Sequence, residues 1–171
     1  MTRAYAVLGT AIGLLAATPA AAQTGIAPYA GEWVGSEITV EAGSWPELAA
    51  EGFAVAISGS DSEFEVDWVG MVPTDGTAAW DELSEEFERA DRAGYYTPDD
   101  DPDVFDGEPQ YWAFSGEAGL VLGRLQLDAA GGRHLLFVCQ LVPTETGLDA
   151  VLMLSATETP TARARVSLVR Q

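Results

Sequence analysis

The residues whose side chains could support catalysis are few. The sequence contains one histidine, His134, and one cysteine, Cys139, which together could form a thiol nucleophile and its base. They lie on an apolar segment with the alternation of a β-strand, and their odd-numbered separation sends the two side chains to opposite faces. A single histidine excludes a multi-histidine metal site, and no G-x-S-x-G turn supports a serine nucleophile. We therefore expect no enzyme activity and a buried, inert Cys139.

A proline-containing acidic stretch is the one place where the sequence could hold a cation. Carboxylates on an irregular loop are the oxygen ligands that Ca²⁺ prefers. The spacing differs from that of an EF-hand, so the main expectation is a solvated acidic loop, with calcium as a minor alternative and no cofactor. The calcium candidates are Asp99, Asp101, Asp103 and Asp106.

A second set of carboxylates could supply the acid and base of a glycosidase. Glu63, Glu65 and Asp67 alternate with large apolar residues over one short segment. That alternation is typical of a strand with one buried and one wet face. We therefore interpret these carboxylates as the solvated face of a strand.

Large aromatic and apolar residues in the predicted strands could bind a small molecule instead. Some of them would face the interior of a barrel, and others flank the acidic stretch, where they could cover one mouth. The ligand-binding candidates are Trp68, Phe64, Phe137, Tyr111 and Phe114.

The elements that must position these residues are predominantly strands. Three apolar segments within Leu120–Leu154, separated by turns at 129–132 and 143–147, predict a β-meander. Elsewhere the sequence predicts five further strands, at Gly31–Glu41, Phe53–Ile57, Glu63–Trp68, Gln110–Ser115 and Ala162–Arg170. The alternation in the first of these is clear from Ser36 onward.

Between the third and fourth predicted strands the pattern changes. Trp80, Leu83, Phe87 and Ala90 recur at helical spacing, and Gly94 could end a helix. We therefore predict an inserted amphipathic helix, followed by an acidic loop over 95–109. The acidic surface from Asp81 to Glu108 would suit a basic protein partner.

Eight sequential antiparallel strands can close into an up-and-down barrel, which leaves no free sheet edge. At the start of the first strand, Gly31-Glu32-Trp33 resembles the G-x-W signature of the lipocalins and wider calycin barrels. The resemblance implies that Trp33 closes the base of the barrel beneath an arginine of the last strand. Arg163, Arg165 and Arg170 are the candidates, and Arg165 is the one preferred. The alternative fold is a two-sheet β-sandwich.

The first residues predict export. Arg3 precedes an apolar run too short to span a bilayer, and small residues follow up to Ala22. We expect 1–22 to be a signal peptide, cleaved after Ala22, and 23–171 to be one barrel domain without a membrane span. The absence of a cysteine at the cleavage point argues against a lipoprotein. The expected location is the periplasm or the outside of the cell.

The net charge of the chain limits the classes of partner that it can bind. The chain of 171 residues has a formal net charge of −19 and contains no lysine, so nucleic acid and anionic lipid surfaces would be repelled. We expect an exported barrel that binds a small apolar or amphipathic molecule. The alternative is an envelope protein with a filled barrel and an acidic surface for a partner.

Overall fold

The computed structural model describes residues 25–43, 52–69, 83–99, 108–127, 134–157 and 161–171, and these ranges contain ten β-strands and no helix. No segment within them is a helix long and apolar enough to cross a membrane. The predicted signal peptide, 1–22, lies outside the described residues. The strands are β1 (Gly31–Ala42), β2 (Ala54–Gly59), β3 (Glu63–Val69), β4 (Leu83–Arg89), β5 (Tyr95–Pro98), β6 (Gln110–Gly116), β7 (Gly119–Leu127), β8 (His134–Pro143), β9 (Leu148–Ala156) and β10 (Ala162–Arg170).

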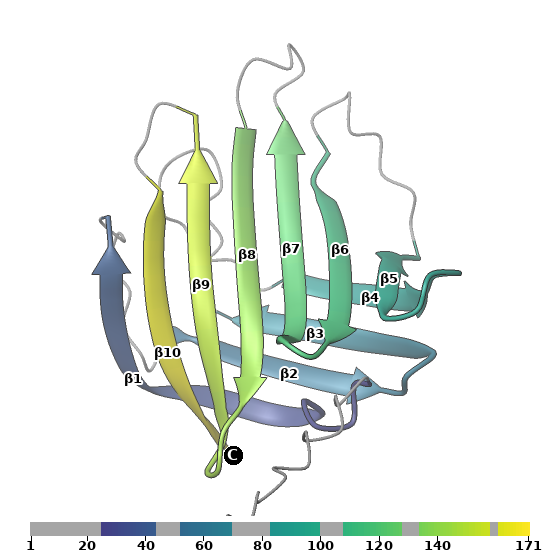
Figure 1. Cartoon of the computed structure of the whole chain (residues 1–171), viewed down its shortest axis with the longest axis horizontal. Helices are drawn as coiled ribbons and strands as arrows, with labels where there is room; N and C mark the ends of the chain where they lie inside the picture. The colour runs from purple at the N-terminus through teal and green to yellow at the C-terminus, as the bar shows by residue number, and fades with distance from the viewer. Residues whose placement is uncertain (1–24, 44–51, 70–82, 100–107, 128–133, 158–160) are drawn as a thin grey trace, which may run out of the picture.

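The ten strands form one closed, antiparallel, up-and-down barrel. Every strand pairs with its neighbours along the chain, and β1 pairs with β10 to complete the ring. In Figure 1, β6–β10 run vertically in front, while β2, β3 and β4 run horizontally behind them. The start of β1 pairs with β2 over Gly31–Val34, and most of β1 also pairs with β10, so this strand joins the two layers.

A β-bulge in β1 determines which of its residues reach the core. The pairing with β10 shifts register between Gly35 and Glu37, and one extra residue moves the following side chains to the other face. Trp33, before the bulge, is 6 % exposed, and Ile38, after it, packs against the core. The bulge therefore allows both Trp33 and Ile38 to face the barrel interior although their numbers differ in parity.

The predicted count of eight strands and the inserted helix are wrong. Residues 83–89 form strand β4, which pairs with β3 from Trp68↔Leu83 to Glu63↔Glu88. Leu83 and Phe87 are four residues apart, a spacing that suits a helix but also leaves both positions on one face of a strand. Pairing with β3, which a local pattern cannot reveal, decides between the two.

The stretch after β4 is also more regular than predicted. Tyr95–Pro98 forms β5, which pairs with β4 and β6 despite the nearby prolines. Pro98 is the last residue of this strand, where a missing N–H disturbs the ladder least. Because β5 links β4 to β6 and β1 meets β10, the sheet closes, and the sandwich alternative is wrong as well.

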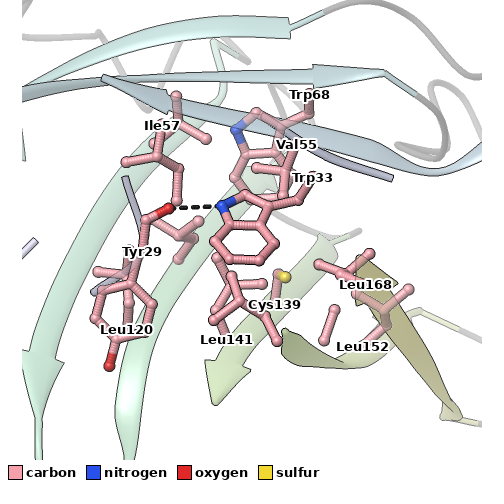
Figure 2. Packing of buried hydrophobic residues seen from close by; sticks show 14 of the residues in the cluster. Tyr29, Trp33, Val55, Ile57, Trp68, Leu120, Cys139, Leu141, Leu152 and Leu168 are labelled. Carbon is pink, nitrogen blue, oxygen red and sulfur yellow. Dashed lines mark hydrogen bonds between the residues drawn. The ribbon is translucent and has the colours of Figure 1, made fainter. Parts of the chain in front are cut away.

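One end of the barrel is closed by the segment before β1. The Trp33 indole N–H donates to the Tyr29 carbonyl at 2.7 Å, and Tyr29 and Ile26 are at most 1 % exposed (Figure 2). The Ser115 hydroxyl bonds both the N–H and the C=O of Gly25. We call this the plugged end; the opposite, distal end carries the starts of β6 and β8 and the ends of β7 and β9.

The arginine that covers Trp33 is Arg170, the last residue of β10. Its guanidinium carbon lies 5.2 Å from the Trp33 ring centroid, and its Nη2 donates to the carbonyl of Ala30. Arg165, the arginine chosen from the sequence, instead pairs on the outer surface with Glu41 and Asp149. Of the three candidate arginines on β10, Arg170 and not the preferred Arg165 lies over Trp33.

The backbone conformation at Gly31 favours glycine beside this contact. Its φ is +131°, a conformation that other residues rarely adopt, and a Cβ there would lie 2.6 Å from Nη2 of Arg170. The first residue of the G-x-W triplet thus leaves room for the arginine that covers its third residue.

Replacing Trp33 tests this closure. Trp33→Ala should lower the free energy of unfolding by about 3 to 5 kcal/mol, because it removes a buried ring and leaves a cavity. Trp112→Ala is the matched control, since Trp112 is 36 % exposed. Urea denaturation followed by circular dichroism should show a much smaller loss for the control; equal losses would contradict the closing role of Trp33.

Candidate functional site

The inward-facing side chains of β6–β10 become more exposed toward the distal end. They form successive cross-strand rows. In the two rows nearest the plug every member is at most 2 % exposed, whereas the distal row is half-buried throughout. The inward-facing side chains are therefore fully buried at the plugged end and less completely buried at the distal end. The rows are Ser115, Leu120, Leu141, Ala150 and Val166; then Ala113, Leu122, Cys139, Leu152 and Ala164; then Tyr111, Arg124, Phe137, Leu154 and Ala162; and last Gln126, Leu135 and Ala156.

Arg124 is the charged member of the third row. It is 8 % exposed, and its Nη2 donates to Oε1 of Gln126 at 3.1 Å. Its Nε and Nη1 are buried and have no hydrogen-bond partner. Its guanidinium carbon lies 5.9 Å from the ring centroid of Tyr111, its cross-strand neighbour. The third row thus presents a cation with unsatisfied donors inside the barrel.

An aromatic pair lies beside this cation. Phe137 is the cross-strand neighbour of Arg124 on β8, and its ring centroid lies 5.6 Å from that of Trp68 on β3. Trp68 is 4 % exposed, and its indole N–H also has no acceptor (Figure 2 shows its ring in the core). The two rings span the interior between the layers and add an apolar wall and a further free donor.

Tyr111 and Glu85 complete the polar part of the interior. Glu85 lies opposite Val66 in the β3–β4 register, on the inward face of β4, and is half-buried. Burial raises the pKa of the Tyr111 phenol above its ordinary value; the nearby Arg124 guanidinium acts in the opposite direction, and the Glu85 charge adds to the increase. Tyr111 therefore keeps its proton at neutral pH and can donate or accept a hydrogen bond.

Only some of the predicted ligand-binding residues lie together. Trp68, Phe137 and Tyr111 surround the third row. Phe64 is also inside, but it is packed between Phe87 and Tyr96, with ring centroids 5.1 and 4.9 Å away. Phe114 lies on the outer face of β6 against Tyr95, at 4.8 Å. The site thus includes three of the five candidates and excludes Phe64 and Phe114.

Sequence reasoning missed Arg124, the most informative residue of the site. The available signal was parity: on β7, Arg124 falls on the same face as Leu120 and Leu122, both fully buried. An arginine at an inward position of an apolar strand is unusual and points to a functional role.

The side chains of His134 and Cys139 are far from forming a catalytic pair. His134 is exposed, and its Nδ1 lies 2.9 Å from Oγ1 of Thr157, whereas Cys139 is 1 % exposed in the second row. Desolvation raises the pKa of the Cys139 thiol to about 12. The thiol therefore stays protonated and inert in the folded protein.

The acidic residues lie mostly outside the barrel. Glu63 and Glu65 face Glu88 and Glu86 across β3 and β4, on the outer surface, with Asp67 further along. Asp99 is exposed; Asp101, Asp103 and Asp106 lie outside the described residues. Among the residues that the structure describes, no group of three or more His, Cys, Asp or Glu side chains could hold a metal ion.

Comparison with known proteins identifies no relatives: no family model and no curated protein matches the chain. The fold itself is the ten-stranded closed barrel described above.

The buried thiol gives a prediction about pH. Because the thiol pKa is higher in the folded state than in the unfolded chain, folding holds the proton, and Cys139 should make stability fall as pH rises from about 9 toward 12. The Cys139→Ala variant should lose less stability than wild type between pH 8 and 10 in urea titrations. Identical pH dependence in the two proteins would contradict a buried thiol.

Proposed function

We propose that this barrel is an exported protein that binds one small apolar or amphipathic molecule in the distal part of its interior and carries out no reaction on it. The gradient of exposure along the inward-facing rows carries the proposal. The rows near the plug leave no accessible inner surface, whereas Leu135, Leu154 and Ala156 are half-buried and face inward.

The composition of this distal interior also supports binding. Small-molecule sites are mostly apolar and contain a few polar groups that orient the ligand. Trp68, Phe137 and Leu154 would contact the apolar part of a ligand, and Tyr111, Arg124 and Gln126 would contact its polar part. The closure of the opposite end by Trp33 and Arg170 supports the resemblance to calycin barrels, many of which hold a ligand inside.

A neutral fluorescent probe tests this proposal. N-phenyl-1-naphthylamine should bind the full chain saturably, with increased emission. Leu154→Trp should weaken this binding at least about tenfold, because the larger ring fills the distal interior. Met153→Trp is the matched control, since Met153 is the preceding residue on β9 and faces outward.

Three results are informative. Loss of probe binding in Leu154→Trp, with binding retained in Met153→Trp, supports an interior site. Equal weakening in both variants, or binding that Leu154→Trp leaves intact, would place the probe elsewhere. An absence of probe binding to the wild-type protein would contradict the proposed function.

A second candidate function is docking of a basic protein on the acidic outer face of β3 and β4. The observation that favours it is the direct opposition of like charges, Glu63 with Glu88 and Glu65 with Glu86, because such pairs destabilise a sheet. A basic partner would relieve this repulsion.

The two pairs can be neutralised together to test the second candidate. Replacing Glu63, Glu65, Glu86 and Glu88 by Gln should abolish capture of a basic partner from a periplasmic extract at low salt. The control replaces Glu32, Glu37, Glu41 and Glu117 by Gln and removes the same charge elsewhere. Capture that both variants lose equally would reflect net charge and not this face.

A further inference from the structure

The burial of Arg124 costs free energy that its contacts within the protein do not offset. Burying a cation removes its hydration, and proteins normally compensate with hydrogen bonds or an opposite charge at each donor. Here Gln126 accepts from Nη2, while Nε and Nη1 remain buried without a partner. Almost all buried polar groups in folded proteins are satisfied, so these donors call for an acceptor that is supplied from outside the chain.

The other described arginines show that this arrangement is specific to Arg124. Arg163 and Arg165 pair with Glu41 on the outer surface, and Arg170 lies over Trp33. Arg89 is exposed at the end of β4, and Arg92 is exposed with its guanidinium carbon 4.3 Å from the Tyr95 ring centroid. Each of these side chains reaches solvent. Arg124 alone among them is buried, at an inward position next to the accessible part of the interior.

We propose that Arg124 binds the acidic head group of a small organic monoanion whose apolar body lies against Trp68 and Phe137. This inference rests on the proposed function and specifies the class of ligand for the same site. A carboxylate or similar oxyanion accepts charge-assisted hydrogen bonds from a guanidinium, and these are about twice as strong as neutral ones. Nε and Nη1 are the donors that such a ligand would satisfy.

The charges around the site favour one negative charge on the ligand. Arg124 is the one cation inside the described part of the barrel, so it can neutralise a single charge. Glu85 also faces this interior, and its field acts on Tyr111. A dianion would therefore be repelled more than a monoanion. The Tyr111 hydroxyl, half-buried beside Arg124, can donate to the same head group.

The experiment compares acids with uncharged analogues of the same shape. Naphthalene-2-carboxylate and naphthalene-2-carboxamide, and in parallel octanoate and octanamide, would be titrated into the full chain at pH 7.5 by calorimetry, and by displacement of N-phenyl-1-naphthylamine. The wild-type protein should bind at least one of the two acids about tenfold or more tightly than its amide. That acid should also raise the melting temperature.

Two substitutions test the role of Arg124. Arg124→Met should reduce the affinity for the acid at least about tenfold and leave the amide nearly unchanged, because it removes the charge and keeps the volume. Without ligand, the melting temperature of Arg124→Met should equal or exceed that of wild type, because the unsatisfied cation is gone. Arg92→Met, which removes a surface arginine, should change neither affinity.

The outcomes separate this inference from the proposed function. If the neutral probe binds but neither acid binds better than its amide, the inference is wrong and the proposed function stands. If the acid preference persists in Arg124→Met, another residue holds the head group and the inference is again wrong. If wild type binds neither the probe nor any of the four compounds, both fail. Should Arg124→Met not fold, the comparison of acids with amides in wild type decides.

Discussion

The structure depends on one constraint: in a closed sheet, every strand must send alternate side chains into an interior of fixed volume. Because β1 and β10 pair, the sheet has no free edge and cannot open to make room for a larger side chain. Near the plug the chain meets the constraint with Ala113, Ala150 and Ala164 among larger apolar residues. Toward the distal end it places polar residues at inward positions instead. The transition from a packed to a polar interior is the feature from which the functional argument follows.

This transition also divides the molecule between stability and recognition. The plugged half satisfies its polar groups: Trp33, Ser115 and Gly25 all have hydrogen-bond partners. Among the described residues, the unsatisfied buried donors are on Trp68 and Arg124, and Phe137 contacts the Trp68 ring and lies opposite Arg124 in the register. Folded proteins tolerate such groups mainly where binding gains from them. Two residues with unsatisfied donors, joined through Phe137, indicate a binding site more strongly than one such residue would.

The sequence was sufficient to predict the eight strands with clear alternation, including β3 and the meander of β7, β8 and β9. The sequence did not predict β4. The spacing of Leu83 and Phe87 fits both a helix and a strand, and only the pairing with β3 determines which one forms. It could not choose between Arg165 and Arg170, because the bulges in β1 set which arginine reaches Trp33. Arg124 was missed for a related reason. Its meaning comes from neighbours on β6, β8 and β3 that are distant along the chain.

The pairing of the first strand with the last sets a limit on when the protein can fold. Trp33 lies opposite Arg170, so the ring of strands is incomplete until β10 has joined it. Contacts between residues so far apart in sequence form slowly, and unpaired strands are exposed in the meantime. A chain in which β10 is not yet free to pair therefore cannot reach the native state. Removal of β10 would leave two open sheet edges, on β1 and β9, that are prone to aggregation.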